Sequence, residues 1–252
     1  DFSSKIKDIK EIPELIKELE FKKEGTNHKI RNYLLNIPNI LDKSVPLGKD
    51  DSENKVIRTW GTKTKFKFTP LHHQDLLENL DQADFVRAAK VSGSRFYYLK
   101  NDLVKLDLAL VNFALDFLTK KGFTPISTPN MLREEILEGA GFLPKGKDDL
   151  YYIKDQDLCL VGTSEQAIAG LHKDETLNEK ALPLKYAGFS PCYRTEAGSH
   201  GKDTKGIFRT HQFNKVEQFV FSHPDNSWKI FDELLKNSET LFQKLKIPYR
   251  VV

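Results

Sequence analysis

Two arginines, a glutamate and a phenylalanine form the densest group of chemically capable side chains in the sequence. Arg194 and Glu196 precede a polar loop, and Arg209 and Phe213 follow it. If the loop joins two antiparallel strands, both guanidinium groups face one polyanion. Guanidinium groups bind phosphate oxygens well because they offer paired donors and a permanent charge. Phe213 can stack on a base, and Glu196 can accept a hydrogen bond from an exocyclic amine.

The order of residues in this segment resembles motif 2 of the class II aminoacyl-tRNA synthetases. It reads R-T-E-A-G from Arg194 and F-R-T-H-Q-F-N-K-V-E-Q from Phe208, which is similar to seryl-tRNA synthetases in particular. The alternative is a pair of surface strands with Arg–Glu ion pairs, but isolated pairs are common and this ordered string is not. The resemblance implies that Arg194 and Arg209 are the catalytic residues. It also implies an ATP-binding set, namely Arg194, Thr195, Glu196, Arg209, Thr210 and Phe213.

A second resemblance lies upstream, where Gly162-Thr163-Ser164-Glu165-Gln166 is similar to the T-x-E loop of the same family. Thr163 and Glu165 would face the amino acid, whose ammonium group needs acceptors and a counter-charge. Standing alone, a Thr before a Glu is typical of a helix cap, and both roles can coexist. The resemblance implies a serine-binding set, namely Thr163, Glu165, Arg194 and Glu217. Glu217 is the best candidate for binding the serine hydroxyl and rejecting alanine.

Residues 122–129 follow a long helical pattern and resemble motif 1, which builds the dimer interface in the family and ends in a proline, here Pro129. The resemblance therefore implies a homodimer, although a proline at a strand end is also simple punctuation. His72 and His73 are the only feature that suggests a metal. Adjacent histidines cannot easily face one ion, so we expect a structural role and predict no metal ligands.

Three loop residues, His200, Lys202 and Lys205, lie between the two halves of the motif 2 segment. The resemblance implies that His200 contacts the acceptor end of tRNA, but an exposed loop histidine without a role is an equal alternative. The two lysines could meet phosphates. The N-terminal helix is expected to bind tRNA(Ser) by resemblance, and a plain coiled-coil pairing surface is the alternative.

The elements around these motifs begin with an amphipathic helical pattern from Phe2 to Leu35. Pro13 should kink or restart it, and the polar stretch 22–29 is either a helix surface or a turn. The sequence Ile37-Pro38-Asn39 should stop the helix. A second amphipathic helix is predicted over 102–121, ending at Gly122, and a last one over 227–245.

Short β-prone runs lie between the helices, over 123–127, 158–161, 208–213 and 216–221. Strands grouped in this way favour an α+β fold over alternating βαβ units. The expected fold class is therefore α+β, with a class II synthetase antiparallel sheet flanked by helices and an N-terminal helical arm. We expect the arm over residues 1–40, a linker over 41–60 and the catalytic core over 61–252.

Composition and charge set the broad class. The 252 residues have 30% charged and 39% hydrophobic residues and a formal net charge of +3, as in ordinary soluble globular proteins. Cys159 and Cys192 lack C-x-x-C spacing and are expected to be reduced and structural. No apolar run approaches a membrane span or a signal peptide, so a cytoplasmic location without membrane contact is expected. The chain begins without Met and ends at the entry to an expected strand, so we expect both ends to be cut.

The resemblance implies a two-step reaction with L-serine, ATP and tRNA(Ser). The serine carboxylate attacks the α-phosphate of ATP to form seryl-adenylate, and serine then passes to the terminal ribose of tRNA. Mg²⁺ is expected with ATP, although the family's Mg²⁺ ligands and motif 3 lie beyond Val252. Two alternatives stay open: a non-catalytic tRNA-binding or subunit-interaction fragment of the same fold, and a paralogue that loads an amino acid onto a carrier protein.

Overall fold

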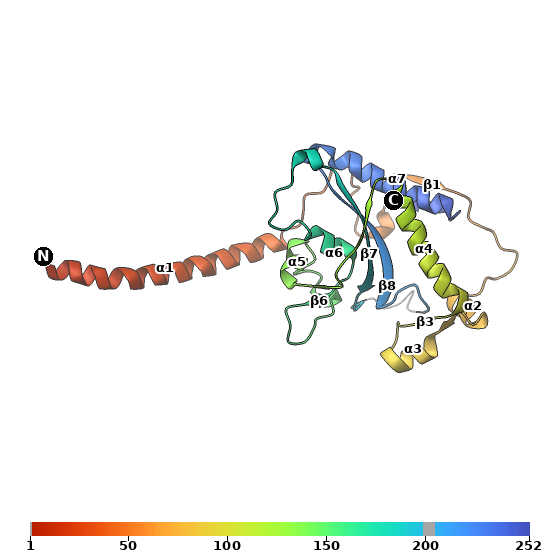
Figure 1. Cartoon of the computed structure of the whole chain (residues 1–252), viewed down its shortest axis with the longest axis horizontal. Coiled ribbons are helices and arrows are strands. Elements are labelled where there is room, and N and C mark those ends of the chain that lie inside the picture. The colour runs from red at the N-terminus through yellow and green to blue at the C-terminus, as the bar shows by residue number, and fades with distance from the viewer. Residues whose placement is uncertain (1, 199–204) are drawn as a thin grey trace.

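The computed structural model describes residues 2–198 and 205–252, and within the first range it describes side chains from Glu11 onward. The chain begins with α1 (Phe2–Asn36), which projects away from the rest of the molecule (Figure 1). Pro13 lies inside this continuous helix, so of the two outcomes predicted for it, a kink or a restart, the restart does not occur. The polar stretch 22–29 is a helix surface and not a turn. The helix ends at Asn36, because Pro38 disfavours helical dihedrals at the residue before it.

The fold is built on a three-stranded sheet in which β7 (Leu184–Tyr193) lies between β4 (Thr124–Ser127) and β8 (Gln212–Phe221). β7 and β8 are antiparallel, with Gly188 opposite Glu217 and Cys192 opposite Phe213. The edge strand β4 pairs with β7 in parallel, so this sheet is mixed and not wholly antiparallel as expected. A parallel pair needs a long crossover connection, and residues 128–183 supply it.

One face of the sheet packs on α4 (Asn101–Thr119) and α7 (Ser227–Lys244). Successive strand residues point to opposite faces, so Ala187, Val216 and Val220 share this side. Their core partners are Phe117, Leu118, Phe123, Leu234 and Leu241. Burial of this apolar set, at roughly 25 cal/mol per Å², fixes α4 and α7 on the sheet and leaves the opposite face for polar residues.

The opposite face carries α6 (Ser164–Ala169). Gly188 allows this close approach, because a Cβ there would lie 2.5 Å from Ile168 Cδ1 and 2.8 Å from Ser164 Oγ. The Ser164 hydroxyl donates to the Gly188 carbonyl at 3.2 Å. A second core, made of Leu132, Leu137, Leu150, Cys159 and Val161, supports α6 from below the sheet edge. It joins α5 (Glu134–Gly139) to the antiparallel pair of β5 (Met131–Leu132) and β6 (Cys159–Leu160).

The remaining strands form two small antiparallel pairs. β1 (Arg58–Trp60) pairs with β9 (Tyr249–Val251), and β2 (Ala83–Asp84) pairs with β3 (Tyr98–Leu99). Two short helices, α2 (His73–Asn79) and α3 (Phe85–Ser92), flank the second pair at the lower right of Figure 1.

The α+β class and the helix end before Pro38 are confirmed. The two long core helices are also confirmed, with ends that lie within two residues of the predicted ones. The expected strand over 208–213 was wrong, because β8 is one continuous strand that starts at Gln212. The backbone N–H of His211 donates to the Arg95 carbonyl at 3.2 Å and so is not available to β7. Among the described residues no helix combines the length and the apolarity that a membrane crossing requires.

Candidate active site

Three functional side chains share the face of β8 that points toward α6. Phe213, Lys215 and Glu217 alternate along the strand, opposite Cys192, Ser190 and Gly188 of β7. Residues two apart in a strand lie on one face, so the three form a row. Arg194 follows the end of β7 two residues after Cys192 and continues this row. The sheet therefore presents an aromatic ring, an ammonium group, a carboxylate and a guanidinium group to the same side.

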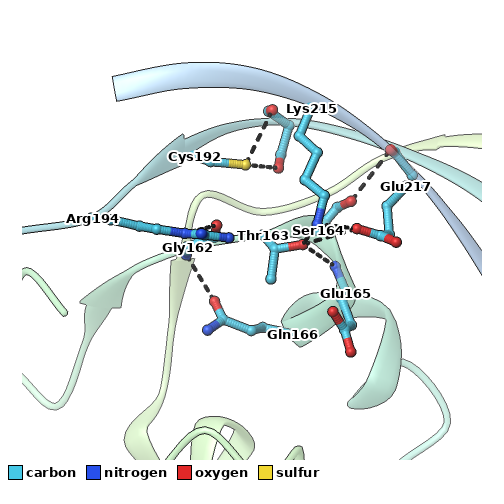
Figure 2. A network of polar contacts seen from close by, with 11 residues as sticks. Gly162, Thr163, Ser164, Glu165, Gln166, Cys192, Arg194, Lys215 and Glu217 are labelled. Carbon is cyan, nitrogen blue, oxygen red and sulfur yellow. Dashed lines mark hydrogen bonds and ion pairs between the residues drawn. The ribbon is translucent and has the colours of Figure 1, made fainter. Parts of the chain in front are cut away.

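Thr163 meets this row from the N-terminus of α6. It is the N-cap of the helix, with its hydroxyl accepting from the backbone N–H of Glu165 at 3.3 Å. The same Oγ1 accepts from Lys215 Nζ at 3.1 Å and donates to Glu217 Oε2 at 3.3 Å. Lys215 and Glu217 also form an ion pair, and Figure 2 shows all four residues around the one oxygen. The helix-cap role is thus confirmed, and it coexists with contacts to the sheet.

Glu165 takes part in this cluster through its backbone N–H. Figure 2 shows its side-chain carboxylate directed away from Glu217. The structure thus joins Thr163 and Glu217 directly.

Arg194 links two cavities. One, of about 200 Å³, is also lined by Gly162, Thr163 and Gln166. The other, of about 320 Å³, is lined by Glu196, Arg209, Thr210 and Phe213, together with Ile207 and Phe208. Nε of Arg194 donates to the Gly162 carbonyl at 3.2 Å, and its guanidinium carbon lies 5.2 Å from the centre of the Phe213 ring. The guanidinium group thus lies between Thr163 of the predicted serine set and Arg209 and Phe213 of the predicted ATP set. Glu165 and Glu217 of the predicted serine set do not line the first cavity.

The second cavity gathers most of the predicted ATP set. Arg209 donates to Glu196 Oε2 at 2.9 Å, so the carboxylate of Glu196 already neutralises part of the positive charge of Arg209. Thr210 is 5% exposed and donates to the Gln212 carbonyl at 3.0 Å. An ATP polyphosphate entering here would meet Arg194 and Arg209 from two sides of the cavity.

Thr195 is placed differently from the rest of the predicted ATP set. Its hydroxyl donates to the Asp148 carbonyl, and its N–H donates to the Asp149 carbonyl at 3.1 Å. Both contacts hold the 3₁₀ turn Lys147–Asp149 against the end of β7. Thr195 therefore shapes the site through a neighbouring turn, and its hydroxyl is already used.

Residues far upstream hold both ends of the motif 2 segment. His73 Nε2 accepts from the backbone N–H of Ile207 at 3.0 Å. Arg95 donates to the Glu196 carbonyl at 3.2 Å, and its own carbonyl accepts from His211. Sequence reasoning missed these roles of His73 and Arg95 and assigned none to Lys215. Only Lys215 carried a local signal, because it lies between Phe213 and Glu217 on one strand face.

The histidine pair has the structural role expected for it. His72 caps α2, with Nδ1 accepting from the Gln74 N–H at 3.3 Å, and the two imidazole rings lie 4.3 Å apart. Within residues 2–198 and 205–252 no group of three or more His, Cys, Asp or Glu side chains is arranged to hold a metal ion. His200 and Lys202 lie outside the described residues, and Lys205 is exposed.

The two cysteines are free and fully buried, as expected for reduced structural residues. Burial raises the pKa of the Cys192 thiol, which lies on the same strand face as the site. It also raises the pKa of the Cys159 thiol in the second core. Both side chains therefore stay neutral at physiological pH and act as small apolar groups.

Comparison with known proteins places this geometry in a family. Residues 151–252 match the model of the tRNA synthetase class II core domain (G, H, P, S and T). A serine–tRNA ligase of Methanospirillum hungatei is 50% identical over 252 residues, which are 100% of this chain and 59% of that protein.

Two solved structures agree with the sequence match. Seryl-tRNA synthetase from Pyrococcus horikoshii complexed with ATP has a TM-score of 0.89 at 49% identity, over 96% of this chain and 58% of that one. The cytoplasmic serine–tRNA ligase from Naegleria fowleri in complex with AMP has a TM-score of 0.84 at 40% identity, over 93% of this chain and 57% of that one. This chain spans about three fifths of the length of the relatives it matches. Over its whole length the chain is similar to serine–tRNA ligases, and its fold matches that of part of a class II tRNA synthetase core.

Proposed function

We propose that this chain carries the serine and ATP sites of a serine–tRNA ligase. One observation supports this above all: Arg194 joins a pocket bounded by Thr163 to a cavity bounded by Arg209 and Phe213. An amino acid in the first and ATP in the second would meet at the Arg194 guanidinium group. That is the arrangement that adenylate formation requires, since the two reactants must be held within contact distance and aligned.

The reaction proposed for this site is attack of the serine carboxylate on the α-phosphorus of ATP. A bond forms between carboxylate oxygen and phosphorus, the bond from that phosphorus to the β-phosphate oxygen breaks, and pyrophosphate leaves. The nucleophile is already an anion, so no general base is needed. Arg194 is assigned to the α-phosphate and Arg209 to the γ-phosphate side, where their fixed charges stabilise the charge that develops on the phosphate oxygens.

Mg²⁺ is expected wherever ATP reacts, because it neutralises the polyphosphate. The part of the chain that the structure describes shows no acidic cluster that would hold the ion by itself. The proposed roles therefore rest on the arginines, and Phe213 is assigned to the adenine ring, on which it would stack.

Partners and location follow from the same proposal. α1 would contact tRNA(Ser), and the protein would act in the cytoplasm, clear of membranes. A homodimer is proposed because α4 leaves two i,i+4 pairs of apolar side chains exposed, Val104 with Leu108 and Leu106 with Leu110, each side chain at least 40% exposed. The arm, linker and core boundaries 1–40, 41–60 and 61–252 are part of this proposal.

Serine-dependent exchange of pyrophosphate into ATP tests the first step directly. The assay uses the native protein that contains these residues. We expect it to catalyse the exchange with L-serine and not with L-alanine. The second candidate is a tRNA-binding or subunit-interaction fragment of the same fold, in which α1, projecting from the rest of the molecule, would make the contact. It predicts tRNA binding without serine-dependent exchange. Exchange with serine but no charging of tRNA would instead favour a carrier-loading paralogue.

A further inference from the structure

The ammonium group of Lys215 lies where two of the proposed serine ligands converge. Its Nζ donates to Thr163 Oγ1 at 3.1 Å and is ion-paired with the Glu217 carboxylate (Figure 2). Its side chain reaches this point from β8 and is 32% exposed, against 22% for Glu217. A cation of the same kind as a substrate ammonium group therefore already contacts the hydroxyl of Thr163 and the carboxylate of Glu217.

The Thr163 hydroxyl has no capacity for another donor. A hydroxyl offers one donated hydrogen and two acceptor lone pairs. The hydrogen goes to Glu217, one lone pair accepts from the Glu165 N–H, and the other accepts from Lys215. The Glu165 bond caps α6, and giving it up would cost about 0.5 to 2 kcal/mol of helix stability. An incoming ammonium group therefore reaches Thr163 at the lowest cost when it displaces Lys215.

We propose that Lys215 is a specificity-determining residue that stands in for the α-ammonium group of the substrate in the empty site. This inference rests on the proposed serine site. Binding of an amino acid exchanges one ammonium group for another at Thr163 and Glu217. Lysine suits this role because its flexible four-carbon stem lets the charge swing aside. A ligand without an ammonium group leaves Lys215 in place and avoids the cost of displacing it. Lys215 therefore narrows the preference of the site for amino acids over the matching hydroxy acids.

The test compares L-serine with 3-hydroxypropionate, which has the same carboxylate and hydroxyl groups but no ammonium group. The Kd of each ligand is measured by calorimetry, or by competition against serine, for the wild type and Lys215→Met. The ratio of the two Kd values isolates the ammonium group, because any contact of Lys215 with the carboxylate affects both ligands alike. We expect the preference for serine to rise by about tenfold in Lys215→Met, since one charge-assisted hydrogen bond no longer has to be displaced.

Two further variants control for charge and for strand lysines in general. Lys215→Arg keeps a cation and should leave the preference near the wild-type value. Lys185→Met removes a lysine of β7 that is ion-paired with Glu233 at 2.6 Å, away from both cavities that Arg194 lines, and it should leave the ratio unchanged. If Lys215→Met does not fold, as judged by circular dichroism, Lys215→Gln takes its place with the same expected direction.

The outcomes separate this inference from the proposed function. Failure of the wild type to bind serine overturns both. Serine binding by the wild type with an unchanged or smaller preference in Lys215→Met overturns only the stand-in role, because Lys215 would then support the substrate. A rise in preference that also appears in Lys185→Met would show a general charge effect and likewise overturn it.

Discussion

Thr163 Oγ1 and Glu217 Oε2 lie 3.3 Å apart, although 54 positions of sequence separate the two residues. The contact exists because Gly188 lets α6 approach the sheet beside β8. It joins a helix cap to the middle of a strand. A ligand that contacts both residues would therefore be held by a helix and a strand at once.

Glu217→Gln is expected to reduce serine activation at least about tenfold while ATP binding changes little. The substitution keeps the shape of the side chain but removes the charge that balances Lys215 and a substrate ammonium group. Pyrophosphate exchange measures activation, and calorimetry measures ATP affinity. Equal losses of serine and ATP binding would contradict the assignment of Glu217 to serine.

Phe213→Ala is expected to weaken ATP binding by roughly 1 to 3 kcal/mol, the range for a base stacked on an aromatic ring. The substitution also removes the ring that lies against Arg194. Phe208→Ala is the matched control, because Phe208 lines the same cavity but is 72% exposed. An unchanged ATP affinity in a folded Phe213→Ala protein would remove Phe213 from the ATP site.

Gly206→Ala is expected to destabilise the protein by about 1 to 3 kcal/mol. Gly206 has φ +77°, and a Cβ there would lie 2.0 Å from His73 Nε2. Because the clash is with His73, the same substitution should cost less in a His73→Ala background. Urea unfolding of both single variants and the double variant should give a coupling of about 0.5 to 3 kcal/mol. Strict additivity would mean that the two residues do not touch.

Glu239→Gln is expected to lower stability at pH 7 but not in acid. The hydrogen bonds from Arg58, with a further one from Tyr249, hold the pKa of the Glu239 carboxyl below its ordinary value, although burial opposes this. A lowered folded-state pKa gives stability that is present above the unfolded pKa, about 4.3, and is lost as pH falls through the folded pKa. The difference between wild type and variant, measured by thermal unfolding, should therefore close below about pH 4.

Its control is Glu18→Gln, since Glu18 and Lys22 form an exposed pair on α1. Such pairs contribute little, so this variant should match the wild type at every pH. If the stability of Glu239→Gln were lower than that of the wild type by the same amount at every pH, the shape of the side chain and not its charge would matter at that position.

Deletion of residues 1–30 is expected to raise the KM for tRNA and to leave pyrophosphate exchange intact. Residues 2–30 belong to the part of α1 that projects from the molecule, whereas Nε of Arg31 donates to Glu138 of α5 at 2.9 Å. A charging assay at varied tRNA concentration measures the first effect. Equal loss of both activities would mean that the arm is needed by the core.

The row on β8 could be predicted because its signal is local. Phe213, Lys215 and Glu217 alternate with period two, and Thr163 precedes a helical run as caps do. The contacts of His73 and Arg95 could not be predicted in this way, since 134 and 101 positions separate them from their partners Ile207 and Glu196. Such contacts arise from packing of whole elements, which no periodicity encodes.

The errors in the strand pattern have the same origin. The residues before Gln212 are β-prone, but the N–H of His211 donates to Arg95 and the N–H of Ile207 donates to His73. The His211 carbonyl accepts from the Arg194 N–H, just past the end of β7. The parallel direction of β4 is set by the long connection to β7. The continuity of α1 through Pro13 likewise shows that one lost hydrogen bond does not end a helix of 35 residues.

The anchoring of the motif 2 segment by His73 and Arg95 sets a lower limit on how far the core can be shortened. A version starting at residue 101 would keep α4, the three-stranded sheet and α7, and so both strands that carry the row. It would lose the acceptor for Ile207 and the donor to Glu196. His73 and Arg95 thus support the motif 2 segment from outside the sheet, and a shortened core that keeps both contacts has to begin upstream of His72.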